Sequence, residues 1–354
     1  MKKLLIFQNE LSGYNVPVYN IIAQHYDLTL AFYLNDKSKT ACSFKKIKLS
    51  SFKLGPFRIV KDAINLASNY DVVCIIPNLR NITYCLLPFL PHKYKIVNWS
   101  IGFRASYTTP YITDRKHVLE DKIFQFVLNH CDSSIFYMDK AKEFWEGTSL
   151  DLSRVFVAPN TTDVVPIDIE AKIKNDFLFV GTLYKGKGVD LLLQSFSKVV
   201  EKYNPTNKLH IVGSGSERES LEKFVSEHDL ESHVVFHGAI YDENVLADIF
   251  AHSLLCISPT QGGLSVPKSM GYGVPFVTRK DAITGGEIYH INSGTNGIMY
   301  QDDTELTSIL TDACQHPKKY IEMGIRAKEY YENNATISHM AQGAIEAFEF
   351  ALNL

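Results

Sequence analysis

Short apolar runs alternate with amphipathic stretches along the first part of the chain. We expect strands at 4–8, 28–34, 72–77, 95–99, 133–136 and 155–158. Between them, apolar residues recur at helical spacing, which predicts helices at 16–25, 57–69, 81–89, 117–130 and 140–145. Strands separated by helical stretches favour right-handed βαβ units and a parallel sheet.

The same alternation begins again after a turn-rich segment. The sequence predicts strands at 176–180, 209–212, 234–237, 255–257, 275–278 and 297–300, and helices at 189–203, 217–228 and 243–252. From about 304 onward only helices are expected. The segment APNTTDVVPID contains two prolines and several turn formers, so we place a domain boundary in it. This gives an N-terminal domain at 1–160, a second domain at 161–335, and a helix at 336–354 that returns to the first.

This pattern predicts an α/β protein with two doubly wound, Rossmann-like domains that face each other across a cleft. The length of 354 residues and the 45% hydrophobic content suit two domains with large cores. Six widely spaced cysteines without a Cys-x-x-Cys pair indicate a reducing compartment, so we expect a cytoplasmic protein. The N-terminal MKKLLIF is interpreted as a first buried strand, because its apolar stretch is too short for a signal peptide.

Charge is distributed unevenly along the chain. The net charge is −3, but residues 1–165 carry 20 Lys and Arg against 14 Asp and Glu, whereas the remainder carries 16 against 25. Within the first part, 37–61 holds eight cations and no acidic residue, interleaved with three phenylalanines. This segment is either a solvated face with its aromatic rings in the core, or a surface for anionic lipid headgroups or an anionic acceptor. The acidic net charge and the lack of a recognition motif disfavour nucleic acid.

Two glycine-rich loops of the second half are candidates for binding a phosphate. In FLFVGTLYKGKGVDLLL, an apolar strand ends at Gly181, and a short loop with Lys185 and Lys187 leads into a helix. Glycine allows close approach of the backbone, lysine supplies charge, and a helix N-terminus offers free N–H groups. In SPTQGGLSVPKSMGYGVP, Gly262 and Gly263 precede a short helix expected at 264–271, with the same consequence. Either loop taken alone could also be an ordinary turn.

A third segment, LHIVGSGSERESLEKF, resembles half of a dinucleotide-binding fingerprint. Gly213 and Gly215 follow a strand and precede a helix, but the third glycine and the acidic residue after the next strand are missing. It is therefore weak evidence for a nicotinamide cofactor, and we expect no cofactor. No Asp-x-Asp pair and no histidine cluster at metal-ligand spacing is present, so no metal site is predicted.

Taken together, these segments resemble the retaining glycosyltransferases of glycosyltransferase family 4. GTLYKGKGVDLLL, IVGSGSERESLE, VVFHGAI, the SPTQGGLSVPKSMGYGVP segment and GGEIYHINSGTNGIMY occur in the family's order and spacing. VAPNTTDV resembles the segment that links the family's two domains. The resemblance covers roughly 155–300 well and the N-terminal half only in outline. It implies the GT-B fold and a nucleotide-diphosphate sugar, UDP- or GDP-linked, as donor.

The resemblance also implies roles for individual residues. Lys187 matches the lysine that contacts the donor diphosphate and stabilises the departing charge, with Lys185 or Lys268 as possible helpers. Gly13 resembles a glycine loop that closes onto the diphosphate. The other expected donor-binding positions cradle the sugar and phosphate or hold the base, and they are Gly181, Thr182, Lys185, Gly213, Gly215, His237, Gly238, Thr260, Gln261, Gly262, Gly263, Leu264 and Ser265.

The sequence departs from the family at several of these positions. The family's arginine after Gly181 is replaced by Thr182, and its paired glutamates fall on Thr260 and Lys268. Similar replacements are associated with a divergent bacterial subgroup that builds surface polysaccharides. The resemblance thus implies a metal-independent hexosyl transfer to a glycan or lipid-linked acceptor, with a peripheral place at the inner membrane face. A silent sugar-nucleotide-binding partner subunit and a GT-B sugar-nucleotide epimerase remain as alternatives.

Overall fold

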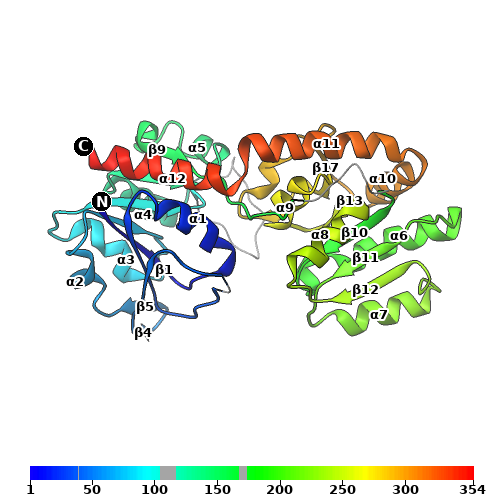
Figure 1. Cartoon of the computed structure of the whole chain (residues 1–354), viewed down its shortest axis with the longest axis horizontal. Coiled ribbons are helices and arrows are strands. Elements are labelled where there is room, and N and C mark those ends of the chain that lie inside the picture. Colours follow the sequence, from blue (N-terminus) through cyan, green and yellow to red (C-terminus); the bar gives the residue numbers. More distant parts are fainter. Residues whose placement is uncertain (39, 104–116, 167–173) are drawn as a thin grey trace. The chain divides into compact units, whose positions relative to one another are not determined.

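A computed structural model describes residues 1–38, 40–103, 117–166 and 174–354. The chain forms two compact units, which we describe separately. Unit 1 comprises the described part of 1–160 together with 336–354, and unit 2 comprises the described part of 161–335. Each unit contains one large parallel sheet with helices against both faces (Figure 1). This confirms the predicted α/β class, with two Rossmann-like units and C-terminal helices.

The sheet of unit 1 has seven strands in the order β3-β2-β1-β6-β7-β8-β9. These strands are β1 (Lys3–Gln8), β2 (Asp27–Phe32), β3 (Lys45–Lys48), β6 (Val72–Ile75), β7 (Lys95–Ser100), β8 (Ser133–Phe136) and β9 (Val155–Val157). The helices of this unit are η1 (Gly13–Asn15), α1 (Val16–Ile22), α2 (Ala63–Ala67), α3 (Ile82–Leu86), η2 (Leu87–Phe89), α4 (Leu119–Asn129), α5 (Lys140–Glu143), η3 (Leu152–Arg154) and α12 (Ile337–Leu352).

The structure corrects one predicted element of unit 1. Residues 57–69 were expected to form a single helix, but they contain strand β5 (Phe57–Val60) followed by the short helix α2. Strand β5 pairs antiparallel with β4 (Ser51–Leu54), and Gly55 at φ +59° supplies the turn between them. Asp62, which precedes α2, has a left-handed backbone conformation at φ 60°. Within the cationic segment, β3 is an edge strand of the sheet, and β4 and β5 form a hairpin.

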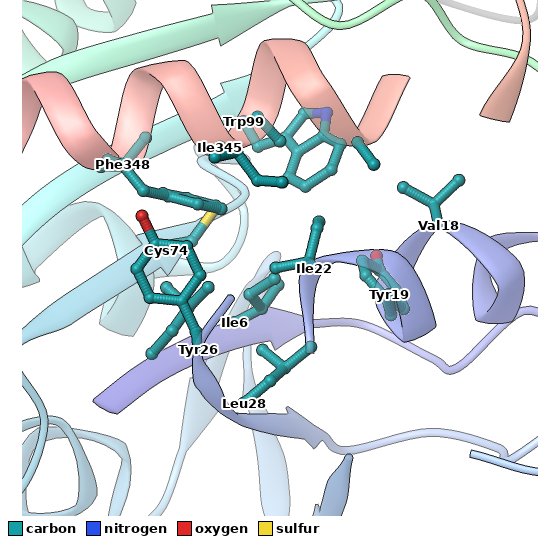
Figure 2. Packing of buried hydrophobic residues seen from close by; sticks show 14 of the residues in the cluster. Ile6, Val18, Tyr19, Ile22, Tyr26, Leu28, Cys74, Trp99, Ile345 and Phe348 are labelled. Atoms are coloured by element: carbon teal, nitrogen blue, oxygen red, sulfur yellow. The ribbon is translucent and has the colours of Figure 1, made fainter. Parts of the chain in front are cut away.

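Helix α12 completes the core of unit 1, although it follows the whole of unit 2 in the chain. Its side chains pack with α1, β6 and β7, and Figure 2 shows Ile345 and Phe348 among Tyr26, Cys74 and Trp99. A buried side chain of this size contributes roughly 1.5–3 kcal/mol. The helix approaches β9 so closely that a Cβ on Gly343 would lie 1.9 Å from the carbonyl oxygen of Val157.

Unit 2 is built on six strands in the order β12-β11-β10-β13-β15-β17. These are β10 (Asp176–Val180), β11 (Leu209–Val212), β12 (Val234–Gly238), β13 (Ser253–Ile257), β15 (Phe276–Arg279) and β17 (Gly297–Tyr300), with a small separate pair β14 (Gln261–Gly262) and β16 (Ile283–Thr284). The helices are η4 (Lys185–Lys187), α6 (Val189–Tyr203), α7 (Arg218–Glu227), α8 (Glu243–His252), α9 (Ser265–Gly271), η5 (Glu287–His290), α10 (Asp303–Gln315) and α11 (Pro317–Asn334). In the described part of the chain, we find no helix that is both long and apolar enough to cross a bilayer.

The packing of α12 predicts that Gly343→Ala destabilises unit 1. The added methyl group meets a backbone oxygen that cannot rotate away, so we expect a loss of about 1–3 kcal/mol or more. Urea unfolding followed by tryptophan fluorescence measures this directly, because both tryptophans, Trp99 and Trp145, lie in unit 1. Gln342→Ala, at an exposed neighbouring position, is the control. Equal unfolding midpoints for the two variants would contradict the packing described here.

Candidate functional site

Four neighbouring strands of unit 2 send their loops out at the same edge of the sheet. These loops follow β12, β11, β10 and β13, and the carboxyl edge of a doubly wound sheet is where such folds bind ligands. The edge brings together the predicted residues at 181–188, 213–215, 237–238 and 260–265. Gly13 belongs to unit 1, where it begins η1 between β1 and α1.

Backbone hydrogen bonds continue the sheet beyond the ends of these strands. The Gly181 N–H donates to the Val212 carbonyl at 3.0 Å, and the Leu183 N–H donates to the Ser214 carbonyl at 2.9 Å. A Cβ at Gly213 would lie 1.8 Å from the Gly181 oxygen, and one at Gly215 would lie 2.1 Å from the Leu183 oxygen. Gly213 and Gly215, which were predicted to bind the donor, are therefore required because the backbone at 213–215 packs directly against the backbone at 181–183.

Two side-chain hydrogen bonds join the loop after β10 to the loop after β13. The Tyr184 hydroxyl donates to the Gln261 side-chain oxygen, and the Thr260 hydroxyl donates to the Gly186 carbonyl at 2.8 Å. Gly188 turns the chain into α6 with a φ of +66°, and a Cβ there would lie 2.9 Å from Thr260 Cγ2. The side chains of Thr260 and Gln261 thus connect the loop after β13 to the loop that carries Lys185 and Lys187.

Lys187 is the side chain of this loop that is best placed to bind an anion. It is half-buried, and its side chain lies near Gly181, where a Cβ would be 3.6 Å from Lys187 Cε. We find no hydrogen bond or ion pair for its ammonium group among the residues that the structure describes. Burial lowers the pKa of Lys187, and the Glu287 carboxylate partly offsets this effect. A partly desolvated cation without a close counter-ion favours a negatively charged ligand.

Glu287 is a buried acid that the sequence analysis did not select. Its carboxylate accepts hydrogen bonds from the Thr284 hydroxyl at 3.0 Å and from the Gly285 N–H at 2.8 Å. These bonds hold the carboxylate where it acts on the Lys187 ammonium. Glu287 lies in the GGEIYHINSGTNGIMY segment that resembles the family. Its effect on Lys187 could not be predicted from the sequence, because the two residues come together only in the tertiary fold.

The adjacent glycines before α9 have different surroundings. A Cβ at Gly262 would lie 2.3 Å from the Ile288 side chain, whereas a Cβ at Gly263 would have no atom within 4 Å. Leu264 is the N-cap residue of α9, and Ser265 is its first residue. Gly262 is therefore required by packing, and Gly263 leaves open space in which a ligand could approach the backbone.

Lys268 is held by an acidic partner that the sequence did not predict. Its ammonium donates to both carboxylate oxygens of Glu243, at 2.7 and 2.6 Å, and the lysine side chain is only 13% exposed. This ion pair connects the first residue of α8 to α9. The role expected for Lys268 at the donor diphosphate would require its ammonium to share its hydrogen-bond donors between Glu243 and the phosphate.

The remaining predicted positions lie at the same edge with few side-chain contacts. Thr182 and Lys185 are exposed, and His237 is exposed near the end of β12 beside Gly238. In the described ranges of the chain, no three His, Cys, Asp or Glu side chains are grouped so as to hold a metal ion.

The second half of the chain is similar in sequence to known glycosyltransferases. Residues 174–316 match the family model described as "Glycosyl transferases group 1". An uncharacterized glycosyltransferase of Haemophilus influenzae is 27% identical over 203 residues, which is 56% of this chain and 56% of that protein. A GDP-mannose-dependent alpha-(1-6)-phosphatidylinositol monomannoside mannosyltransferase of Mycolicibacterium smegmatis is 26% identical, covering 42% of this chain and 41% of that protein. The chain thus matches just over half the length of the first relative.

The fold is similar over nearly the whole chain to solved structures. The crystal structure of Anabaena Alr3699/HepE in complex with UDP covers 98% of this chain and 99% of that chain, with a TM-score of 0.73 and 15% identity. This likeness shows that the chain has the GT-B fold. Together with the family match, it supports a glycosyltransferase of the GT-B type.

The different surroundings of the two glycines predict different effects of the same substitution. Gly262→Ala places a methyl group against Ile288, so we expect a loss of about 1–3 kcal/mol and a melting temperature lower by about 2–10 °C. Gly263→Ala should leave the melting temperature within about 1 °C of wild type, since its methyl group enters open space. Thermal unfolding followed by circular dichroism at 222 nm compares them. A Gly263→Ala variant as unstable as Gly262→Ala would show that the loop is packed differently.

Proposed function

We propose that this chain is a retaining, metal-independent glycosyltransferase that moves a hexose from a UDP- or GDP-linked donor to a glycan or lipid-linked acceptor in the cytoplasm. The observation that carries this proposal is the half-buried ammonium of Lys187 at the carboxyl edge of the unit 2 sheet, whose burial the Glu287 carboxylate offsets only in part. It lies within the segment that matches the glycosyl transferase model. Support for the donor comes from similar proteins, one GDP-mannose-dependent and one solved in complex with UDP.

The proposed chemistry is a transfer without a protein nucleophile. The bond between the sugar's anomeric carbon and the β-phosphate oxygen breaks, and the electron pair leaves with the nucleoside diphosphate. The acceptor hydroxyl attacks on the face that the diphosphate leaves, and its proton passes to a diphosphate oxygen. Lys187 stabilises the negative charge that develops on the diphosphate, assisted by the exposed Lys185 of the same 3₁₀ turn.

If Lys187 has this role, Lys187→Ala should lower kcat by about 10²-fold or more, the order expected for one electrostatic donor. The matched control is Lys202→Ala, an exposed lysine in the last turn of α6, whose turnover should stay near wild type. The kcat of each variant is measured from the rate at which UDP or GDP is released from the donor. The donor is first selected by a thermal-shift panel of UDP-, GDP-, ADP- and CMP-sugars.

Two outcomes would count against this assignment. Turnover of Lys187→Ala close to wild type would remove Lys187 from the mechanism. Selective binding of a sugar nucleotide by wild type, with neither transfer nor hydrolysis, would favour the silent partner subunit, for which the replacements at Thr260 and Lys268 are the sequence argument.

We further propose that unit 1 contacts anionic lipid through the β4–β5 hairpin. Three cations of the 37–61 segment are engaged elsewhere, since Lys37 pairs with Glu10, Lys45 with Asp27, and Lys46 with Asp36. By contrast, Lys48, Lys53 and Lys61 are exposed and have no ion-pair partner among the described residues. Beside them the hairpin exposes apolar side chains, namely Phe52 at 44%, Leu54 at 62% and Phe57 at 43%. Cations flanking exposed apolar groups suit an anionic interface.

Liposome flotation tests this surface with two charge-matched sets of substitutions. Wild type should float with anionic vesicles at low salt and be released at high salt, because each unpaired cation contributes about 1 kcal/mol and salt screens it. Replacing Lys48, Lys53 and Lys61 with Gln should abolish flotation, whereas replacing the ion-paired Lys37, Lys45 and Lys46 with Gln should retain most of it. Equal flotation of wild type and the triple variant would show that the hairpin is only a solvated face.

A further inference from the structure

Helix α4 of unit 1 is apolar on two faces. Its buried side chains, among them Val127 and Leu128, pack into the unit. Leu119, Ile123 and Phe126 are exposed, and because they are four and three residues apart they lie side by side on one face of the helix. A surface helix usually has one apolar face, which packs on the core, and is polar elsewhere. The second apolar face of α4 is therefore not explained by the core of unit 1.

The short helix η2 extends this apolar face. The Phe89 ring stacks on the Phe126 ring, with 5.1 Å between the centroids and 10° between the planes. The His130 ring lies 4.6 Å from the Phe89 ring and 4.5 Å from the Phe126 ring. Leu86, three residues before Phe89, and Val118, the N-cap residue of α4, are exposed as well. We call these exposed apolar residues the α4 patch, which consists of Leu86, Phe89, Val118, Leu119, Ile123 and Phe126.

The α4 patch is large for the surface of a monomer. The exposed fractions of its residues run from 38% at Phe89 to 72% at Leu119. With about 200 Å² for a whole side chain of this size, the six together expose about 600 Å². Monomeric proteins rarely expose a larger apolar patch, and a stable interface buries about 800 Å² on each partner. The patch therefore supplies most of the area of a specific protein interface.

The charges of α4 favour a protein partner over a lipid surface. The helix carries Glu120, Asp121 and Lys122, of which Asp121 is buried. Helices that lie on anionic membranes are rich in Lys and Arg on their polar face, whereas α4 has a single lysine. The β4–β5 hairpin, with three exposed lysines beside its apolar side chains, is better suited to lipid.

We propose that the α4 patch is the interface of a symmetric homodimer, in which two copies of the chain pair their α4 helices antiparallel. The patch has an aliphatic end, with Val118 and Leu119, and an aromatic end, with Phe89 and Phe126. A two-fold axis that overlaps the whole face sets each aliphatic end against an aromatic end and places Ile123 of one copy opposite Phe126 of the other. Aromatic side chains near the centre of an interface supply much of the binding energy. The inference does not depend on the proposed function.

Sedimentation velocity of the full chain tests the dimer. Wild type should change from a monomer to a species of twice the chain mass between about 1 and 200 µM, as expected for an interface at the lower end of specific sizes. Ile123→Glu should weaken the association at least about 100-fold, because each dimer would bury two unpaired carboxylates. Both this variant and its control should fold, since each replaces an exposed side chain, and circular dichroism verifies this.

The matched control is Ile325→Glu on α11 of unit 2. Ile325 is exposed by 53%, close to Ile123 at 45%, but its neighbours on the helix surface are the exposed acids Glu322 and Glu329. A single exposed apolar side chain in polar surroundings is ordinary for a protein surface. We therefore expect Ile325→Glu to dimerise like wild type.

Mixing two variants tests the antiparallel arrangement. Phe126→Lys alone should be monomeric, like Ile123→Glu. An equimolar mixture of the two should form a dimer, because the introduced carboxylate then faces the introduced ammonium while the second Ile123–Phe126 pair is native. Recovery of the dimer requires that both copies use the same patch.

Four results would overturn the inference. Wild type that stays monomeric at the highest concentration, or Ile123→Glu that dimerises like wild type, would show that the α4 patch is not a dimer interface. A mixture that stays monomeric would rule out the antiparallel contact. Wild type that floats as a monomer with neutral vesicles, when Ile123→Glu does not, would assign the patch to lipid.

Discussion

The candidate site in unit 2 depends on the contact between two backbone segments that follow strands of the sheet, 181–183 after β10 and 213–215 after β11. The oxygens of Gly181 and Leu183 occupy the space in which side chains at 213 and 215 would begin. Only glycine can stand at those positions without moving one segment away from the other. Because the first segment leads directly into the Lys187 loop, this contact also fixes where that loop starts. The second segment is bonded in turn to Gly238, so the same contact reaches the edge strand beside His237.

The two half-buried or buried lysines at this edge have different electrostatic surroundings. The Lys187 ammonium is partly desolvated, and its opposing carboxylate, Glu287, is itself held by Thr284 and Gly285. Lys268, which stands where the resembling family has an acid, has instead acquired Glu243 as a close partner. The Lys268 ammonium thus joins two helices, whereas the Lys187 ammonium has no hydrogen-bond partner among the described residues. Hydrogen bonds from Tyr184 and Thr260 order the loop in advance, which reduces the entropy lost when a ligand binds.

The period of the hydrophobic pattern was sufficient to predict most helices and strands. The features that it did not predict are short elements and contacts between residues distant in sequence. Long segments with a clear period, such as α6 at Val189–Tyr203, have the bounds that the pattern predicted. The prediction of one helix at 57–69 was wrong because the four residues of β5 are too few to show the period of two that marks a strand. The helical pattern of α2 was therefore extended to include them. The two candidate phosphate-binding loops could be located from their glycines and lysines, and their role stays a prediction. Glu243 and Glu287 could not be assigned, because each acts on a lysine that is distant in sequence.

The position of α12 has a consequence for the order in which the protein is made. Strands β1, β6 and β7 leave the ribosome early, yet 236 residues separate the end of β7 from the start of the helix that covers them. At 5–20 residues per second, the apolar surface that α12 covers stays open for about 12–47 s of synthesis. Unit 2, whose residues are contiguous from 161 to 335, can close its core before unit 1 does. Nascent chains should thus acquire protease resistance first in the later part of the sequence, the reverse of the usual N-terminal-first order.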